Sequence, residues 1–369
     1  MPDSHLDASD DAAQKQPAPR DHSANQMIQG LWYVALPSGA LKPGQMEART
    51  LLGQPLLFAR RTDGGVFAVR DQCPHRGTPL RFGTFDGETV ACPYHGWRFN
   101  GAGVCTAIPS LVSQDDINLS RIKCGAFACV ERQGLIWIYL PAPGESADQP
   151  PPEPELFPGF ETMPAKAAIR LVYNAPFDEA AFGMMDAAHI PFVHRAWWMK
   201  RKPTDLRLKE KNFEPYGLGW RMKPHDIPNL TPFHRLLGGQ VKTEIQLRLP
   251  GFRIEIIYGE RHRILNLLAI TPIDDQRTQM LQALWWTMPG LDFLSPLVAV
   301  MAKRFLRQDA DIIDKQNLGL KFSQPRLMID DADTQMKWWL QVKREWASRL
   351  REDRPFVNPV QPATLRFRS

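Results

Sequence analysis

Two short loops, each carrying one cysteine and one histidine, constrain this chain more than any other feature. The first reads CPHRGTPL (73–80) and the second CPYHGW (92–97), so the histidine follows its cysteine by two residues in one loop and by three in the other. A proline directly after each cysteine and a glycine later in each loop favour tight turns around a bound group. Together the loops offer four metal ligands, Cys73, His75, Cys92 and His95.

The distribution of these ligands favours a two-iron cluster over a single zinc ion. Two Cys and two His are a generic set for structural zinc, but zinc fingers usually pair Cys with Cys and His with His along the chain. Here each loop gives one thiolate and one imidazole, so one iron can take both sulfurs and the other both imidazoles, as in a Rieske [2Fe-2S] centre. Because imidazole is neutral, the cluster carries less negative charge and its reduction potential rises. A zinc-stabilised binding module is the alternative.

The remaining cysteines and the start of the chain indicate a reducing compartment. Three cysteines have no comparable histidine partners and are interpreted as small buried side chains: Cys105, Cys124 and Cys129. A total of five cysteines is odd, which argues against a secreted disulfide framework. Residues 1–26 lack the apolar core of a secretory signal and have the composition of a disordered tail. The apolar stretch 291–305 is too short and too charged to span a bilayer, so we expect a cytoplasmic protein without a transmembrane segment.

The length and the pattern of short strands predict two domains. A chain of 369 residues exceeds what one hydrophobic core usually serves. Between 31 and 140, strand-like runs broken by Gly and Pro predict a small all-β domain, bounded as 27–140, that carries both loops. A Pro-rich linker is expected at 141–158 and a second domain at 159–369. The net charge of +5 is small, and because no long basic run occurs we expect no nucleic-acid partner.

The second domain has the pattern of an α+β fold. The expected strands are 167–174, 243–249, 252–259, 264–272 and 280–288, several of which alternate with period two. The expected helices are 178–189, 293–318 and 332–351. A series of antiparallel strands with helices at its margins predicts one sheet flanked by helices.

The sequence CPHRG followed by CPYHGW resembles the Rieske domain of the Rieske non-haem iron oxygenases of the aromatic-ring-hydroxylating type. Rieske proteins of respiratory complexes carry an extra cysteine in each loop, and neither loop of this chain has one. The resemblance extends from about Leu31 to the last helix. It implies a catalytic domain of the helix-grip (START-like) type with a mononuclear Fe²⁺, and a ring-shaped homotrimer.

The resemblance also implies ligands for that iron, which is held by two histidines and one carboxylate. In MMDAAHIPFVH (184–194), Asp186 precedes His189 by three residues, so a helix would place both on one face. A proline then tends to end the helix, which lets His194 turn back toward the same centre. In the family's motif the two histidines bind iron and the aspartate is a bridge. The match implies that Asp186 connects His189 to His95 of a neighbouring subunit.

The third ligand is expected in RFLRQDADIIDKQ (304–316). Helical spacing places Asp309 within an apolar face, and groups Asp311 and Asp314 with Gln308 on the polar side. A carboxylate within an apolar face is costly unless it is paired or bound to metal. QDADIIDKQ also resembles the family's late acidic motif with Asp309 at the ligand position. Asp311 is the alternative ligand.

Two further expectations concern the surroundings of the iron. Gly183 stands where family members often have an Asn that tunes the iron site, so this role is unfilled or taken by another residue. Candidates for an apolar substrate pocket are Met184, Met185, Trp197, Trp198, Met199, Leu267, Trp285 and Trp286.

The activity implied by the resemblance is the use of O₂ to hydroxylate, or oxidatively demethylate, a hydrophobic aromatic or polycyclic substrate. Electrons from NAD(P)H would arrive through a ferredoxin, a reductase or both, because this chain has no FAD or NAD fingerprint and is interpreted as the oxygenase component alone. The alternatives are the alpha subunit of a cis-dihydroxylating dioxygenase and a Rieske electron-transfer protein without a catalytic iron.

Overall fold

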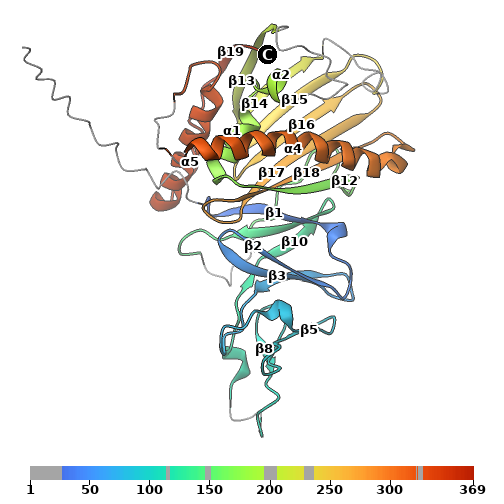
Figure 1. Ribbon diagram of the computed structural model, residues 1–369, viewed down its shortest axis with the longest axis vertical. Helices are drawn as coiled ribbons and strands as arrows, with labels where there is room; N and C mark the ends of the chain where they lie inside the picture. Colours follow the sequence, from blue (N-terminus) through green and yellow to red (C-terminus); the bar gives the residue numbers. More distant parts are fainter. Residues whose placement is uncertain are drawn as a thin grey trace, which may run out of the picture.

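The protein has two halves that differ in architecture (Figure 1). The computed structural model describes residues 27–113, 117–145, 151–194, 206–227, 237–320, 322 and 327–369. The N-terminal half consists of small β-sheets, and the C-terminal half consists of one large sheet with helices against one face. The molecule is elongated because the two halves are stacked end to end. The expected tail at 1–26 lies outside the described residues.

The N-terminal half contains three antiparallel sheets. The first has the order β1 (Leu31–Pro37), β11 (Leu135–Leu140), β10 (Cys129–Arg132). The second has the order β2 (Met46–Leu51), β3 (Gln54–Arg60), β4 (Val66–Arg70), β9 (Ala126–Phe127). The third consists of the short strands β5 (Thr84–Phe85), β6 (Val90–Ala91), β7 (Arg98–Phe99) and β8 (Cys105–Ala107). This third sheet lies at the far end of the molecule and carries the second Cys/His loop between β6 and β7.

The C-terminal half is built on an eight-stranded antiparallel sheet in the order β12-β18-β17-β16-β15-β14-β13-β19. The strands are β12 (Ala167–Tyr173), β13 (Leu208–Tyr216), β14 (Gly219–Asp226), β15 (Lys242–Arg248), β16 (Phe252–Tyr258), β17 (Arg263–Pro272), β18 (Thr278–Trp286) and β19 (Ala363–Arg368). The helices are α1 (Phe177–Met185), α2 (Ile190–Val193), α4 (Ser295–Leu320) and α5 (Thr334–Glu352). Figure 1 shows α4 crossing the sheet, and α1 lying between α4 and α5. The predicted fold class, an all-β Rieske domain followed by a helix-flanked antiparallel sheet, is confirmed.

The opposite face of the large sheet packs against the N-terminal half. The Thr271 hydroxyl donates to the Val34 carbonyl at 2.8 Å. The Gln279 amide donates to the Ala35 carbonyl at 3.0 Å. Trp137 and Trp285 share one buried core cluster across this contact. The two halves are therefore joined by a packed and hydrogen-bonded interface as well as by the chain itself.

A buried polar network anchors the helix that leads into the site. The Asp178 carboxylate on α1 accepts hydrogen bonds from the Lys343 ammonium at 2.6 Å and the Trp339 indole at 2.8 Å, both on α5. Gln335, also on α5, donates to the Met185 carbonyl at the end of α1 at 3.1 Å. These bonds pair the buried Asp178 carboxylate through its Oδ1 and satisfy a helix-end carbonyl, and they fix the point at which the chain leaves α1.

The predicted strands agree with the structure, but one predicted helix extends four residues too far. The helix expected over 178–189 ends at Met185. Asp186 has an extended backbone, and its carboxylate accepts from the Ala188 N–H at 2.7 Å and the His189 N–H at 3.3 Å. Such local bonds compete with helical ones. Pro191 lies in the first turn of the new helix α2, where its missing N–H is not needed, rather than ending a long helix.

Candidate iron centres

The two Cys/His loops fold into matching turns. In the first loop the Gly77 N–H donates to the Cys73 carbonyl at 2.9 Å, and in the second the Gly96 N–H donates to the Cys92 carbonyl at 3.0 Å. Both glycines have positive φ, +75° and +70°, which side chains other than glycine rarely adopt. In each loop the cysteine N–H also closes back onto a carbonyl five residues later. The two loops therefore have equivalent backbones, although the histidine follows its cysteine by two residues in one loop and by three in the other.

The four predicted ligands divide into a buried pair and an outer pair. Cys73 and Cys92 are 2% and 3% exposed, whereas His75 is exposed and His95 is partly buried. The two histidine rings lie with centroids 4.7 Å apart. Burial, with a further contribution from the adjacent Cys92 thiol, raises the pKa of Cys73 to about 11. Backbone N–H groups of the same loop oppose this rise, so they face the sulfur and are oriented to stabilise a thiolate.

This arrangement fits a [2Fe-2S] cluster better than one zinc ion. The ligand atoms of a single tetrahedral zinc lie about 3.3–3.8 Å from one another. Among the described residues, the His, Cys and carboxylate ligand atoms that all lie within 4.8 Å of one another belong to a group outside these loops. The four loop ligands are therefore spread more widely than a single zinc ion allows. A two-iron cluster separates its sulfur-bound iron from its imidazole-bound iron and suits the buried and outer pairs.

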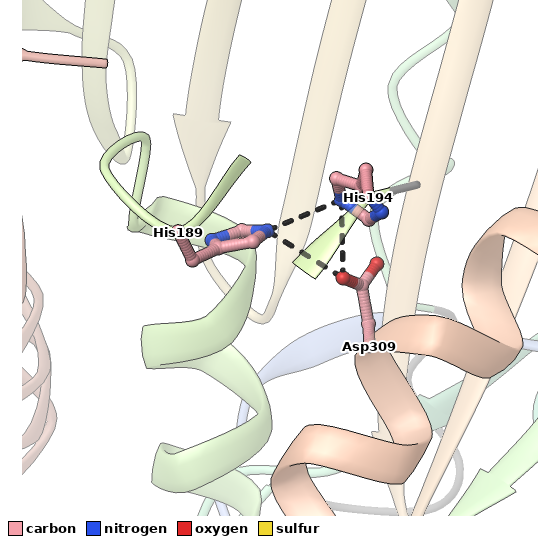
Figure 2. Close-up of side chains that lie close together, drawn as sticks. All are labelled: His189, His194 and Asp309. Atoms are coloured by element: carbon pink, nitrogen blue, oxygen red, sulfur yellow. Dashed lines mark hydrogen bonds and ion pairs between the residues drawn. The ribbon is translucent and has the colours of Figure 1, made fainter. Parts of the chain in front are cut away.

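The compact group is the one predicted in the second domain (Figure 2). The Nε2 atoms of His189 and His194 lie 3.3 Å apart. Oδ1 of Asp309 lies 3.5 Å from the His189 Nε2 and 3.2 Å from the His194 Nε2. Two atoms that bind one ion at about 2.1 Å and at right angles lie about 3.0 Å apart, so this triangle is close to one face of an octahedral site.

The two ends of α2 and the middle of α4 position the triangle. His189 lies just before α2, His194 just after it, and Asp309 points from the middle of α4 toward both (Figure 2). The His194 ring is stacked on Phe305, one turn earlier on α4, with centroids 3.8 Å apart. Tyr173 on β12 donates to the Leu306 carbonyl of α4 at 3.4 Å, which helps fix the helix against the sheet.

Both histidines have their other ring nitrogen occupied. Nδ1 of His189 faces the Asp186 carboxylate at 3.6 Å, and Nδ1 of His194 faces the Gln308 side-chain oxygen at 3.3 Å. Because both partners are acceptors, the proton belongs on Nδ1 and the lone pair on Nε2. Metal-ligating histidines use such partners to fix the tautomer and the ring orientation. Sequence reasoning missed Gln308, which it placed on the polar side of the helix.

Charge at the triangle also fits a bound cation. Burial by itself lowers the pKa of His189, but Asp186 and Asp309 outweigh it and raise that pKa to about 9. Oδ1 of Asp309 is buried and has no hydrogen-bond partner among the described residues, although two imidazole nitrogens approach it. An unpaired buried carboxylate oxygen is costly, and a cation held by all three side chains removes that cost.

The other candidate positions are also placed. Asp311 is exposed, as expected of a solvated side chain, while Asp314 is partly buried. A Cβ at Gly183 would meet Ile313 at 3.1 Å, so the Asn found in many family members would require Ile313 to move. Cys105 and Cys124 are buried and Cys129 is partly buried, in agreement with their interpretation as small apolar side chains.

A cavity of about 320 Å³ adjoins the triangle. It is lined by His189, His194 and Asp309, and by apolar side chains such as Met184, Met185 and Leu268. The other pocket candidates differ: Leu267 and Trp285 are buried in the core that faces the N-terminal half, and Trp286 belongs to another core cluster. Trp197, Trp198 and Met199 lie outside the described residues.

A β domain whose two loops carry a [2Fe-2S] ligand set, followed by a helix-flanked sheet with a His₂–Asp triangle at a cavity, has the candidate sites of a two-centre iron protein. Residues 31–124 match the model of the Rieske [2Fe-2S] domain. Chlorophyllide a oxygenase, a chloroplast protein of Chlamydomonas reinhardtii, is 31% identical over 352 residues, which are 90% of this chain and 51% of that protein. The oxygenase component of dicamba O-demethylase from Stenotrophomonas maltophilia is 33% identical over 174 residues, 46% of this chain and 48% of that protein.

The crystal structure of dicamba monooxygenase bound to dicamba has the same fold, with a TM-score of 0.67 and 22% identity over 89% of this chain and 99% of that one. Residues 31–124 are therefore a Rieske [2Fe-2S] domain, and the chain as a whole is similar to the oxygenase (alpha) subunits of Rieske non-haem iron oxygenases. The matches to the first curated relatives span about half of their length or less. Among the described residues, no helix combines the length and apolar character needed to cross a membrane.

Proposed function

We propose that this chain is the oxygenase component of a multicomponent Rieske oxygenase that uses O₂ to hydroxylate, or oxidatively demethylate, a hydrophobic aromatic or polycyclic substrate. The observation that carries the proposal is the triangle of His189, His194 and Asp309 at the wall of a cavity. Its ligand set is that of non-haem Fe(II) oxygenases, which leaves positions open for oxygen. The names of the relatives, a monooxygenase and a demethylase among them, support this reaction class.

When bound, the [2Fe-2S] cluster supplies electrons and the mononuclear iron supplies reductive activation of O₂. In this proposal Cys73 and Cys92 hold the cluster from the protein interior, and His75 and His95 hold it from the outer side. The exposed outer side is where a ferredoxin or an NAD(P)H-dependent reductase can approach. Tyr94, stacked on His95 with centroids 3.8 Å apart, is 58% exposed and adds an aromatic contact surface there.

Asp186 is the proposed link between the two centres. Its carboxylate faces His189 Nδ1, and although burial opposes the effect, its pKa lies below the ordinary value because His189 and backbone N–H groups donate to it. It therefore stays ionised and can accept a further hydrogen bond. The third sheet and α2 lie at opposite ends of the molecule (Figure 1), so we propose that the His95 that reaches Asp186 belongs to a neighbouring subunit of a homotrimer.

The division of the chain into a Rieske domain (27–140), a Pro-rich linker (141–158) and a catalytic domain (159–369) is part of the same proposal. So is a cytoplasmic location. The alternative of a cis-dihydroxylating dioxygenase alpha subunit uses the same ligands, and product analysis with ¹⁸O₂ separates it from a monooxygenase.

A metal count on the purified chain tests the proposal. Three irons and two acid-labile sulfides per chain are expected. Two irons would instead indicate an electron carrier, and zinc without iron a binding module. Asp309→Ala should keep the cluster's visible spectrum and lose one iron and turnover. Asp311→Ala is the matched control on the same helix and should keep the cluster spectrum, all the iron and turnover. If Asp311→Ala lost iron and turnover while Asp309→Ala kept them, the ligand would be Asp311.

The proposed link has its own test. Asp186→Asn keeps a similar shape but loses the charge that holds the His189 tautomer and accepts from a second histidine. All metals should remain bound, while single-turnover transfer from the reduced cluster slows by at least tenfold. Unchanged transfer would remove Asp186 from the route between the centres.

A further inference from the structure

Four polar side chains cross the sheet face that forms the wall of the cavity. They are Arg253 and Glu255 on β16, Asn266 on β17 and Gln282 on β18, and we call them the polar row. Glu255 pairs with Asn266 in the strand register, and Gln282 lies one pair further along the same face. Their neighbours at the cavity are apolar: Met222, Ile245, Leu268 and Met280. Polar groups among apolar ones in a pocket fix the orientation and identity of a ligand.

The hydrogen bonds within the polar row are all donated toward the Glu255 carboxylate. Arg253 donates to the Glu255 carboxylate at 3.2 Å. The Asn266 amide group makes a long contact with the same carboxylate oxygen at 3.5 Å, and the Gln282 amide group donates to the Asn266 carbonyl oxygen at 2.8 Å. Because an ionised carboxylate only accepts, Asn266 must present its NH₂ to Glu255, and Gln282 must then present its NH₂ to Asn266.

This direction leaves one buried acceptor of the row without a partner. Oε1 of Gln282 is buried and has no hydrogen-bond partner among the described residues, and the whole residue is 8% exposed. Oε1 of the partly buried Glu255 makes no bond within the polar row. An unsatisfied buried acceptor is destabilising. A ligand in the cavity that donates a hydrogen bond to it would remove this cost.

The charges of the polar row cancel. Arg253 is the row's cation and Glu255 its anion, and they are paired with each other. A carboxylate or sulfonate at this wall would lie beside Glu255 and would have to compete with it for Arg253. A neutral group that donates a hydrogen bond meets neither penalty.

We propose that the polar row selects an uncharged, largely apolar substrate that carries a hydroxyl or N–H group, with Gln282 and Glu255 as the specificity-determining acceptors. This inference rests on the proposed function, because it takes the cavity beside the iron ligands as the substrate site. It narrows the substrate from hydrophobic compounds in general to those with one hydrogen-bond donor.

Equilibrium binding to the iron-loaded protein, measured by isothermal titration calorimetry, tests it with matched probes. The first set is 2-naphthol, its methyl ether 2-methoxynaphthalene, and the anion 2-naphthoate. The second pair is 4-phenylphenol and 4-methoxybiphenyl. Each ether keeps the ring system and the oxygen but loses the donor. We expect each phenol to bind about tenfold more tightly than its ether, as for a hydrogen bond to an otherwise unpaired acceptor, and 2-naphthoate to bind more weakly than 2-naphthol.

Two variants separate the acceptors. Gln282→Leu removes one acceptor with little change in volume and should reduce the phenol-to-ether ratio to about twofold. Glu255→Gln leaves Arg253 without its anion and should strengthen 2-naphthoate binding about tenfold. Met280→Leu is the matched control, because this residue lies on β18 on the same face and has no polar atom. It should shift phenol and ether together and leave their ratio unchanged.

A wild-type ratio near one for both ring systems would overturn the proposal, and so would a ratio that survives Gln282→Leu. Tighter binding of 2-naphthoate than of 2-naphthol would identify an anion site at Arg253 instead. Unchanged 2-naphthoate binding in Glu255→Gln would reject the charge argument. The iron count of each sample is measured in parallel, so that loss of the mononuclear iron, which would contradict the proposed function, is distinguished from loss of probe selectivity.

Discussion

The two candidate iron centres of this chain are built in opposite ways. The cluster loops lie between 73 and 97, within one small domain, and each is closed by its own backbone hydrogen bonds. The mononuclear site combines His189 and His194 with Asp309, more than 100 residues later, and Nδ1 of His194 faces Gln308 on the same distant helix as Asp309. One site is local in sequence, and the other depends on how α1, α4 and α5 pack.

The difference predicts how each centre responds to damage. A local site should fail when its own turns are strained and should be indifferent to distant packing. A site assembled from separate helices should fail when those helices move, even if every ligand is intact. The variants below are ordered from the largest expected effect to the smallest, and each would weaken the comparison if it affected the wrong centre.

Breaking the buried ion pair behind α1 should have the largest effect. In Lys343→Met, Asp178 stays buried with one partner fewer, which costs about 3 kcal/mol of folding free energy. Because this pair fixes α1 against α5, mononuclear iron should be released at a clearly lower urea concentration, while the cluster's visible absorbance persists to higher urea. The readouts are iron retained after gel filtration and absorbance of the cluster along the same titration.

Lys337→Met is the matched control for this change. Lys337 is on the same helix but pairs with Asp330 at the surface, so the cost should be below about 1 kcal/mol. If Lys343→Met bleached the cluster first, the assignment of α1–α5 packing to the mononuclear site would be wrong.

Removing the acceptor behind His194 should have the next largest effect. Gln308→Leu leaves Nδ1 of His194 without the oxygen that fixes its tautomer. Loss of such a partner typically weakens metal binding by about 10–100-fold. Competition with an Fe²⁺ chelator measures the affinity, and the cluster spectrum should not change.

Gln316→Leu serves as the control for Gln308→Leu. This glutamine is also on α4 but donates to Glu179 at 3.0 Å, away from the iron ligands. Its Fe²⁺ affinity should equal that of the wild type. Equal affinities in both variants would show that His194 does not depend on Gln308.

The same contrast explains what the sequence could predict. The candidate cluster ligands could be selected from two motifs of eight and six residues, because each motif folds into a local turn. Asp309 could be selected because a carboxylate on an apolar helix face is unusual, and the structure places it beside His189 and His194. Gln308 was placed on the polar side, since the pattern of one helix does not show that His194 approaches from another element.

Other features required the three-dimensional structure for similar reasons. The end of α1 at Met185 depends on side-chain bonds from Asp186 to the backbone, which compete with a helical pattern that looked continuous. In the sequence, the residues of the polar row are only part of alternating strands. The register of β16, β17 and β18 shows that they lie together on one face of the sheet. Strands β13, β14 and β19 were not predicted. β13 and β14 form a hairpin, and β19 pairs with β13 at the sheet edge across a long separation in sequence.

Strain in the cluster turns should have a smaller effect that is confined to the cluster. Gly77→Ala and Gly96→Ala each force alanine into positive φ, at a cost of about 1–2 kcal/mol. A Cβ at Gly96 would also meet Pro109 at 3.1 Å, whereas at Gly77 the nearest atom is 3.5 Å away. Gly96→Ala should therefore lower the thermal midpoint of cluster bleaching more than Gly77→Ala. Mononuclear iron content should be unchanged in both, and the opposite order would contradict the steric argument.

The smallest effect concerns a charge in the hairpin between β5 and β6. N–H groups of Thr89 and Glu88, with the Arg98 guanidinium, lower the pKa of Asp86 to about 2. A depressed carboxyl pKa stabilises the folded state above the ordinary pKa of 3.8, and this contribution disappears as pH falls toward 2.

Asp86→Asn should therefore cost less than about 1 kcal/mol at pH 7, because Arg98 and Asp86 are both partly exposed and solvent screens them. The difference between variant and wild type in urea unfolding should shrink as the pH is lowered below about 5. A difference that grew toward acid pH would mean that Asp86 is not held ionised by its neighbours. Because the hairpin belongs to the cluster end alone, Fe²⁺ affinity at Asp309 should be the same in both proteins at every pH tested.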